Sequence, residues 1–270
     1  YQAIANVIAQ RAYPQLVQTD QFVYGSVLVP EVQLGTDLLK TPDATFYFFK
    51  FWKSLYNKFK DSVIKAIEVD KASYKFETDI TGFFDSIPHY NLLLTLSTEF
   101  SVEDEILDLL SECLNAWSGT KENSTPGVGI PQGPVPSFFF ANLLLHPLDK
   151  QVIGDAFKYY RYMDDINIYG YSEEELLDVL VTIDNYLKGH GLSINSKKTR
   201  IEKIDPDKED ETVKALRRLE VTGEQYDGTY VLSKEMEEEL SFQFFLDDPD
   251  RWQEIQDERQ AKEKEKEQEK

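Results

Sequence analysis

Two adjacent carboxylates, Asp164 and Asp165, stand between two runs of strand-forming residues at 157–163 and 166–169. This pattern predicts a β-hairpin with both acids at its tip. Like charges so close together repel one another, and a tight turn does little to screen them. Aspartate is also a common turn residue, so the pair alone does not define a site. Oxygen ligands of this kind suit Mg²⁺, and that interpretation calls for further ligands elsewhere in the chain.

A third carboxylate, Asp79, comes at the end of an alternating run at residues 74–80 that predicts another strand. The elements predicted from there on are strand, helix, helix, hairpin, helix and strand. This order indicates an α+β domain, in which an antiparallel sheet has helices packed on one face. In such a sheet Asp79 can lie beside the hairpin tip, although it precedes Asp164 by 85 residues. Taken alone, Asp79 is equally well a strand-end cap.

Composition narrows the class of protein. The 270 residues begin with Tyr1 and not with Met, which predicts a fragment of a longer chain. No apolar run approaches the roughly 18 residues that cross a membrane, and the single cysteine, Cys113, gives no disulfide framework. We therefore expect a cytoplasmic protein without a membrane partner. The net charge of −20 argues against nucleic-acid binding, which favours clusters of Lys and Arg.

A helix rich in aromatic residues and lysines is predicted over residues 46–67. It is either an amphipathic helix with a solvated lysine face or a surface that follows a nucleic-acid backbone, with aromatic rings available for stacking. A further helix is expected over residues 234–246. The Glu- and Lys-rich end, residues 251–270, is expected to be a solvated helix or a disordered tail.

Four segments resemble motifs of prokaryotic reverse transcriptases, in the order in which that family carries them. Residues 79–89 read Asp-Ile-Thr-Gly-Phe-Phe-Asp-Ser-Ile-Pro-His, and residues 129–137 read Gly-Ile-Pro-Gln-Gly-Pro-Val-Pro-Ser. Tyr162-Met163-Asp164-Asp165 resembles the polymerase box, and residues 191–199 resemble the motif that follows it. The form of the second motif is closest to bacterial retron-like, abortive-infection and defence-associated enzymes.

The resemblance implies a metal site and a nucleotide site. Two Mg²⁺ ions, with Mn²⁺ as the alternative, would be held by the carboxylates of Asp79, Asp164 and Asp165 and by the carbonyl oxygen of Ile80. Backbone N–H groups would face the triphosphate of the incoming nucleotide, since a concave run of amides suits an anion; they belong to Thr81, Gly82 and Phe83.

Three further side chains take roles from the resemblance. Phe84 would lie under the sugar and exclude a 2′-hydroxyl, the alternative being an ordinary buried ring. Gln132 would contact nucleotide and template from a glycine-bounded loop. Lys198, or Lys197 in its place, would protonate the departing pyrophosphate, the alternative being a solvated lysine at a strand start. Arg161 also matches the family, in a structural role.

The implied architecture is a right-hand polymerase palm with partial fingers. The palm would comprise residues 73–91 and 133–204, with residues 92–132 as an insertion between fingers and palm. Residues 1–72 would form partial fingers and connecting helices. Residues 205–250 would be a connector or a vestigial start of the thumb, and residues 251–270 a charged tail.

The implied activity is that of an RNA-directed DNA polymerase. It would add dNTPs to the 3′-hydroxyl of a DNA or RNA primer on an RNA template, by a two-metal mechanism and in bacterial antiphage defence. A non-coding RNA or a protein primer is an alternative partner. The acidic charge and the lack of a recognisable thumb after residue 204 keep one alternative open, untemplated or protein-primed DNA synthesis of the abortive-infection type. The alternative from another class is a catalytically silent palm that acts as a scaffold or sensor.

Overall fold

The computed structural model describes residues 1–29, 48–50, 52–118, 125–208, 210–218, 225–226 and 229–230. The chain divides into two compact units, Tyr1–Leu219 and Glu220–Lys270. In the second unit the described residues are β5 (Gln225–Tyr226) and β6 (Thr229–Tyr230), which pair antiparallel. The helix expected over residues 234–246 and the tail at 251–270 lie outside the described residues.

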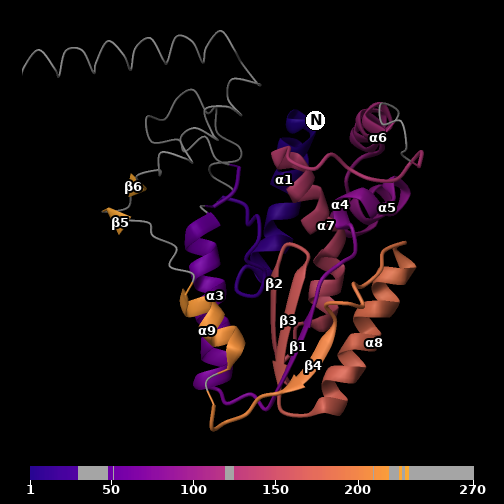
Figure 1. The fold of residues 1–270 in the computed structure, drawn as a ribbon. Coiled ribbons are helices and arrows are strands. Elements are labelled where there is room, and N and C mark those ends of the chain that lie inside the picture. The colour runs from indigo at the N-terminus through magenta and orange to yellow at the C-terminus, as the bar shows by residue number, and fades with distance from the viewer. Residues whose placement is uncertain are drawn as a thin grey trace, which may run out of the picture. The chain divides into compact units, whose positions relative to one another are not determined.

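An antiparallel sheet forms the centre of the first unit (Figure 1). Its strands are β1 (Tyr74–Thr78), β2 (Lys158–Tyr162), β3 (Asp165–Gly170) and β4 (Arg200–Lys203). Their order across the described sheet is β2-β3-β1-β4. β1 pairs with both β3 and β4, and β2 and β3 form a hairpin in which Tyr162 is opposite Asp165. The predicted α+β class, with its antiparallel sheet, is confirmed.

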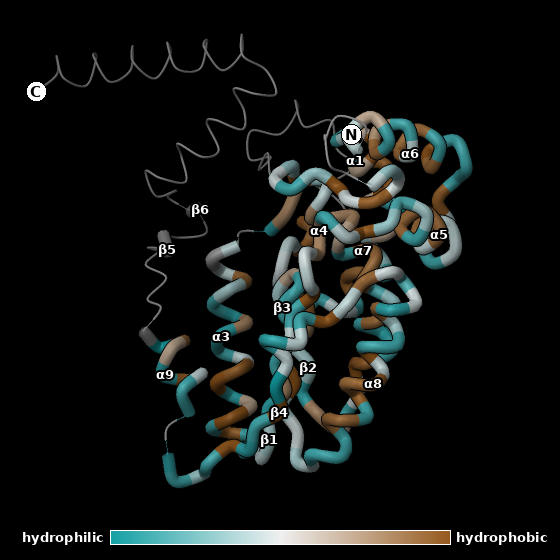
Figure 2. Tube along the Cα trace, turned by 45° about the vertical axis from the view of Figure 1, so that its right-hand side comes forward, coloured by the Kyte–Doolittle hydropathy of each residue, from teal (hydrophilic) through white to brown (hydrophobic). Residues whose placement is uncertain are grey.

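The main core lies between one face of this sheet and a group of helices. The sheet contributes Phe76, Ile166 and Ile168, which are fully buried. The helices are α1 (Gln2–Leu16), which continues into the 3₁₀ turn η1 (Val17–Thr19), α5 (His89–Phe100), α6 (Asp104–Ser118), α7 (Val135–Val152) and α8 (Glu173–Gly189). Figure 2 shows hydrophobic and hydrophilic segments alternating along α8, as expected of a helix with one face on the sheet.

The opposite face of the sheet carries helices as well, which corrects the expectation of helices on one face only. α3 (Trp52–Glu68) and α9 (Glu211–Arg218) pack there against Tyr160 and Tyr169. The reason lies in β2 and β3, where Tyr159 faces the main core while its neighbour Tyr160 faces α3. A strand with large apolar groups on both sides needs cover on both sides. Across the described residues, no helix combines the length and apolarity that a membrane span requires.

Candidate functional site

The acidic hairpin tip predicted from the sequence is present, with one difference in detail. Met163 and Asp164 form a two-residue turn, whereas Asp165 is the first residue of β3. Met163 has a φ of +55°, in the left-handed region that a non-glycine residue rarely adopts. The turn therefore holds a strained backbone as well as two neighbouring carboxylates.

Asp79 directly follows β1, and its side chain is buried. Its backbone carbonyl accepts a hydrogen bond from Asn195 N at 2.8 Å, and Ser193 O accepts one from Thr81 N at 2.9 Å. Ile80 and Ile194 face each other between these two bonds. Polar groups alternate in direction along an antiparallel ladder, so the Ile80 carbonyl points the other way, toward β3.

The three carboxylates lie within electrostatic reach of one another. Burial raises the pKa of Asp164, and the negative charge of Asp79 raises it further. The pKa of Asp165 is raised by desolvation and then by the charge of Asp164. Lys198 opposes this repulsion, because its ammonium donates a hydrogen bond to Oδ2 of Asp79, and that bond raises the pKa of Lys198. The structure thus brings together the four side chains predicted to carry the chemistry.

The donor set suits a hard divalent cation. Oδ1 of Asp79 is buried and has no hydrogen-bond partner, a condition that costs free energy unless a ligand satisfies the oxygen. Carboxylate oxygens are the ligands that Mg²⁺ and Mn²⁺ prefer. Among the described residues, however, no group of three or more His, Cys, Asp or Glu side chains is arranged so that it could hold a metal ion, and this includes the three aspartates as they are placed. Lys198 holds the other oxygen of Asp79, which leaves Oδ1 as the oxygen for a cation.

A cavity of about 410 Å³ lies next to these carboxylates, between the sheet and the pair α3 and α9. Asp79, Asp165 and Lys198 line it, and Tyr56 of α3 and Leu216 of α9 form part of its wall. The ring of Tyr56 meets that of Tyr162 edge to face, with 5.6 Å between ring centres. Burial raises the pKa of Tyr56, and the charge of Asp165 adds to the effect.

Two aromatic residues of α3, Tyr56 and Phe59, are thus engaged in packing. Phe59 is buried beside Tyr24 and Tyr162, while Lys58 and Lys65 are exposed to solvent. Of the two interpretations of this helix, the amphipathic one describes these residues. The rings of Tyr56 and Phe59 are not available for base stacking in this arrangement, whereas Trp52 is 47% exposed.

The first motif bends sharply after Asp79. Gly82 has a φ of +52° and precedes the short helix α4 (Phe83–Ser86). Phe83 faces the core, whereas Phe84 is partly exposed and packs edge to face on Phe138 at 5.2 Å. Phe84 is therefore the ring of the two that can meet a ligand. The Thr81 N–H is engaged by Ser193 O, so a triphosphate would find the amides of Gly82 and Phe83 rather than that of Thr81.

Gln132 lies in the exposed loop that precedes α7. The loop is attached to the first motif, because Ile130 N donates to Phe84 O at 2.8 Å and His89 Nε2 contacts Gly129 O at 2.7 Å. These bonds place the predicted Gln132 and Phe84 on neighbouring segments.

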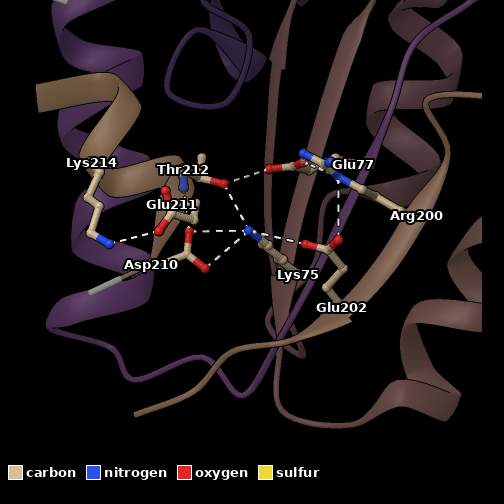
Figure 3. Close-up of polar contacts among 8 residues, drawn as sticks. All are labelled: Lys75, Glu77, Arg200, Glu202, Asp210, Glu211, Thr212 and Lys214. Carbon is tan, nitrogen blue, oxygen red and sulfur yellow. Dashed lines mark hydrogen bonds and ion pairs between the residues drawn. The ribbon is translucent and has the colours of Figure 1, made fainter. Parts of the chain in front are cut away.

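A polar network beside the cavity joins α9 to the sheet (Figure 3). Lys75 is buried, and its ammonium donates to Asp210 at 3.1 Å and to Thr212 Oγ1 at 2.9 Å. Glu77 accepts hydrogen bonds from Arg200 Nε at 2.8 Å and from Thr212 Oγ1 at 3.1 Å. Sequence reasoning missed this network. The available signal was the charged residue at every second position of β1, since such a row needs partners on that face.

The fold and site define an α+β protein with an acidic turn, a neighbouring strand-end aspartate and a paired lysine at one end of an antiparallel sheet. The sequence profile of the family described as reverse transcriptase (RNA-dependent DNA polymerase) matches residues 16–245, so the chain belongs to that family.

Two kinds of relative accompany this assignment. An uncharacterized 91 kDa protein in a cob intron of Schizosaccharomyces pombe is 39% identical over 75 residues, which are 27% of this chain and 9% of that protein. Apo telomerase from Candida tropicalis, truncated from its C-terminal domain, gives a TM-score of 0.48 at 14% identity, over 73% of this chain and 40% of the telomerase chain. Telomerase from Candida albicans, in complex with a TWJ fragment of telomeric RNA, gives a TM-score of 0.48 at 11% identity. The match covers 87% of this chain and 37% of that telomerase chain. The chain therefore spans less than half the length of these relatives.

Proposed function

We propose that this chain is the catalytic palm of an RNA-directed DNA polymerase. It would add dNTPs to the 3′-hydroxyl of a DNA or RNA primer on an RNA template. The observation that carries the proposal is the position of Asp79 beside the turn of Asp164 and Asp165, in a chain of the reverse transcriptase family. The pKa values of the two turn carboxylates are raised in part by their acidic neighbours, which is the electrostatic signature of a site that stores negative charge for a cation.

Asp79, Asp164 and Asp165, with the Ile80 carbonyl, would hold two Mg²⁺ ions, or Mn²⁺ in their place. When bound, the two ions supply a lower pKa for the attacking hydroxyl and neutralise charge on the leaving group. Oδ1 of Asp79 supports this assignment, since it is a buried oxygen without a hydrogen-bond partner.

The chain's own residues would then orient the nucleotide and supply a proton. The amides of Gly82 and Phe83 would bind the triphosphate, and Phe84 would exclude a 2′-hydroxyl. Gln132, in the attached loop, would contact nucleotide and template. Lys198 would protonate the leaving pyrophosphate, a role supported by the position of its ammonium at Asp79. The bond to Asp79 raises the pKa of Lys198 and so opposes proton release, which means that the ammonium would have to leave Asp79 before it acts as an acid.

Primer extension by the full-length protein tests the proposal. We expect metal-dependent incorporation of dNTPs on a primed RNA template, and its loss in Asp79→Asn and Asp164→Asn. Arg11→Met, which changes an exposed residue of α1, serves as the control and should retain full activity. An intact protein that incorporates no nucleotide on any primer with Mg²⁺ or Mn²⁺ would rule the activity out.

One observation favours a second candidate, untemplated or protein-primed DNA synthesis. α3 and α9 cover the sheet face that borders the carboxylates, and their side chains line the cavity there. A covered face suits a site that handles a single strand better than one that holds a duplex. Sequencing the product decides between the two, because a product that copies the supplied template excludes untemplated synthesis.

The biological setting and the domain limits are finer proposals. We assign residues 73–91 and 133–204 to the palm, because β1 to β4 and α7 lie within them. Bacterial antiphage defence rests on the form of the motif at residues 134–137 alone. Phage plating on bacteria that express the full-length protein tests it, and equal plating with the wild type and Asp164→Asn would reject it.

A further inference from the structure

A buried hydrogen-bond network lies directly beneath the turn that carries the two carboxylates. Its centre is Arg161 of β2, which is 1% exposed. Nε and Nη2 of Arg161 donate to the two oxygens of Asp149 on α7, at 2.7 and 2.6 Å. Nη1 donates to the backbone carbonyl of Met163 at 2.7 Å and to Oδ1 of Asn142 at 2.9 Å. The guanidinium thus joins the helix in the core to the turn by a fork of fixed geometry.

The segment after η1 holds the same turn from another side. Tyr24 N donates to Arg161 O at 2.8 Å, and Arg161 N donates to Phe22 O at 2.9 Å, so that this segment runs parallel to β2. Asn142 also donates to Gly25 O at 2.7 Å. Gly25 lies against Met163 so closely that an added Cβ would come within 2.8 Å of Met163 Cγ and nearer still to its backbone nitrogen.

These contacts matter because the turn is a high-energy structure. Met163 is held at a positive φ, and the two carboxylates raise each other's free energy by repulsion. A strained turn keeps its shape only where its surroundings determine it. Arg161 and Gly25 are those surroundings, because they contact Met163 from two different elements.

The network is also complete in its polar partners. Asp149 is 1% exposed and accepts a hydrogen bond from Tyr159 OH at 2.7 Å in addition to those from Arg161. The adjacent carboxylate raises the pKa of Arg161 against the effect of burial, so the guanidinium stays charged. A buried ion pair with all its hydrogen bonds made is rigid, and a rigid base is what a metal site of fixed geometry requires.

We propose that Arg161 is a positioning residue for the two turn carboxylates, supported by Asn142, Asp149 and Gly25. We refer to these four residues as the turn clamp. The proposal rests on the proposed function, in which Asp164 and Asp165 hold the metal ions. A clamp of this kind fixes the position and orientation of the turn. Its loss should therefore change metal affinity and kcat rather than the KM for nucleotide.

The test removes the clamp without leaving a buried charge. Arg161→Met combined with Asp149→Asn deletes both members of the ion pair, which spares the fold the cost of an unpaired carboxylate, and the amide oxygen introduced at position 149 would still accept from Tyr159. The matched control is Arg11→Met, because Arg11 forms an exposed ion pair with Glu103. The readouts are the melting temperature, hydrogen exchange of the peptide that contains residues 162–166, Mn²⁺ binding by calorimetry, and kcat and KM of the full-length protein.

We expect the folded double variant to bind Mn²⁺ about 10- to 100-fold more weakly, the range typical of residues that orient metal ligands. We also expect faster exchange in the turn and a loss in kcat of about 100-fold, as for a displacement near 1 Å, with little change in KM. A folded double variant with the turn exchange and Mn²⁺ affinity of the wild type overturns the proposal.

A second variant decides the matter if the double variant does not fold. Arg161→Lys keeps a positive charge for Asp149, but a single ammonium cannot also replace the bond to the Met163 carbonyl. Faster exchange in the turn of this variant supports the clamp, and unchanged exchange rejects it. The exchange experiment is independent of the metal. If the wild type shows no Mn²⁺ binding that depends on Asp164, the proposed function fails, while exchange still decides the role of Arg161.

Discussion

Lys198 and Asp79 form an ion pair at the mouth of the site, although 119 residues separate them in the chain. The ammonium neutralises a carboxylate that also faces the charges of Asp164 and Asp165. Lys198 itself is largely exposed, so it is free to swing toward a ligand. The pair therefore couples the proposed proton donor to the proposed metal ligand, and a change at one should be felt at the other.

Removal of the lysine is expected to separate metal affinity from catalysis. Lys198→Met deletes the ammonium that competes with a metal ion for the Asp79 carboxylate. Because the ammonium and the metal ion then no longer oppose each other's binding, Mn²⁺ should bind about threefold to tenfold more tightly. Nucleotide incorporation should nevertheless fall by about 10²-fold or more, the usual contribution of a general acid. Calorimetry and single-turnover kinetics measure the two effects. Lys197→Met is the control, and it should change Mn²⁺ affinity and the incorporation rate less than Lys198→Met does. An equal loss of incorporation in the two variants would contradict the role of Lys198.

Neutralising one turn carboxylate is expected to stabilise the protein while it abolishes metal binding. In the folded state the pKa of Asp164 is raised, so ionisation destabilises the fold once the pH exceeds the unfolded pKa near 4. That penalty is present at neutral pH and disappears as the pH falls through the folded pKa. Asp164→Asn should therefore gain about 0.5 to 1 kcal/mol at pH 7.5, as active-site replacements often do, and less at a pH of about 4, near the unfolded pKa. Urea unfolding at the two pH values checks this, and a destabilised Asn variant would be inconsistent with repulsion in the turn.

The sequence predicted the parts of the site that follow from strand period and element order. Alternation at residues 74–80 located β1, and an antiparallel sheet then brought Asp79 to the hairpin tip. The positive φ of Met163 was not predictable, because no Gly or Asn marks that position and the constraint comes from Arg161 and Gly25.

Other features depend on contacts that no local pattern encodes. Lys75 and Asp210 meet across 135 residues, and charge along β1 shows only that partners are needed, not where they lie. The Thr81 amide was assigned to a triphosphate from the family resemblance. Its bond to Ser193 follows instead from how residues 193–195 pair beside β1, a register that the sequence does not specify.

The Lys75 network is expected to contribute strongly to stability through α9. Lys75→Met leaves Asp210 without its buried partner, which should cost about 3 kcal/mol. Lys75→Met with Asp210→Asn should recover most of that loss, because the amide oxygen introduced at position 210 can still accept from the Thr212 N–H at the start of α9. Urea denaturation of the single and double variants measures the difference. A double variant no more stable than the single one would show that α9 is held by other contacts.

Asp210 also gives this network a pH dependence. Burial alone would raise its pKa, but the bonds from Lys75 and the Thr212 N–H outweigh that effect and lower it. A lowered carboxyl pKa in the folded state stabilises the protein above the unfolded value and is lost as the pH falls through the folded value. The stability gap between the wild type and the double variant should thus shrink in acid.

His146 should act as a second source of acid sensitivity, this time inside the core. It is 1% exposed, neither ring nitrogen has a hydrogen-bond partner, and burial lowers its pKa to about 4. A base with a lowered folded pKa contributes stability above its unfolded pKa of about 6.5, and that stability declines as the pH falls. The loss between pH 7 and pH 5 should be about 2 kcal/mol.

Replacing this histidine by an apolar residue isolates its contribution. His146→Leu should match or exceed the wild type at pH 7 and lose less stability at pH 5, because Leu has nothing to protonate. Unfolding curves of both proteins at the two pH values give the comparison, which cancels the titration of all other groups. Parallel losses in the two proteins would mean that His146 takes up a proton as readily in the folded state as in the unfolded state, and so would contradict the lowered pKa.

A methyl group at Gly25 should damage the site through Met163. The Cβ of Gly25→Ala would clash with the Met163 backbone nitrogen, and the overpacking should cost about 1 to 3 kcal/mol. Because Met163 carries the turn, we also expect a loss in kcat of up to about 100-fold. Gly189→Ala is the matched control, since Gly189 lies at the end of α8 with nothing within 4 Å of an added Cβ. That change should stabilise the protein by up to about 1 kcal/mol and leave activity intact. Thermal unfolding and primer extension measure both variants. If Gly25→Ala lost stability without losing activity, the two turn carboxylates would have kept the positions that catalysis requires. Gly25 would then contribute to packing alone.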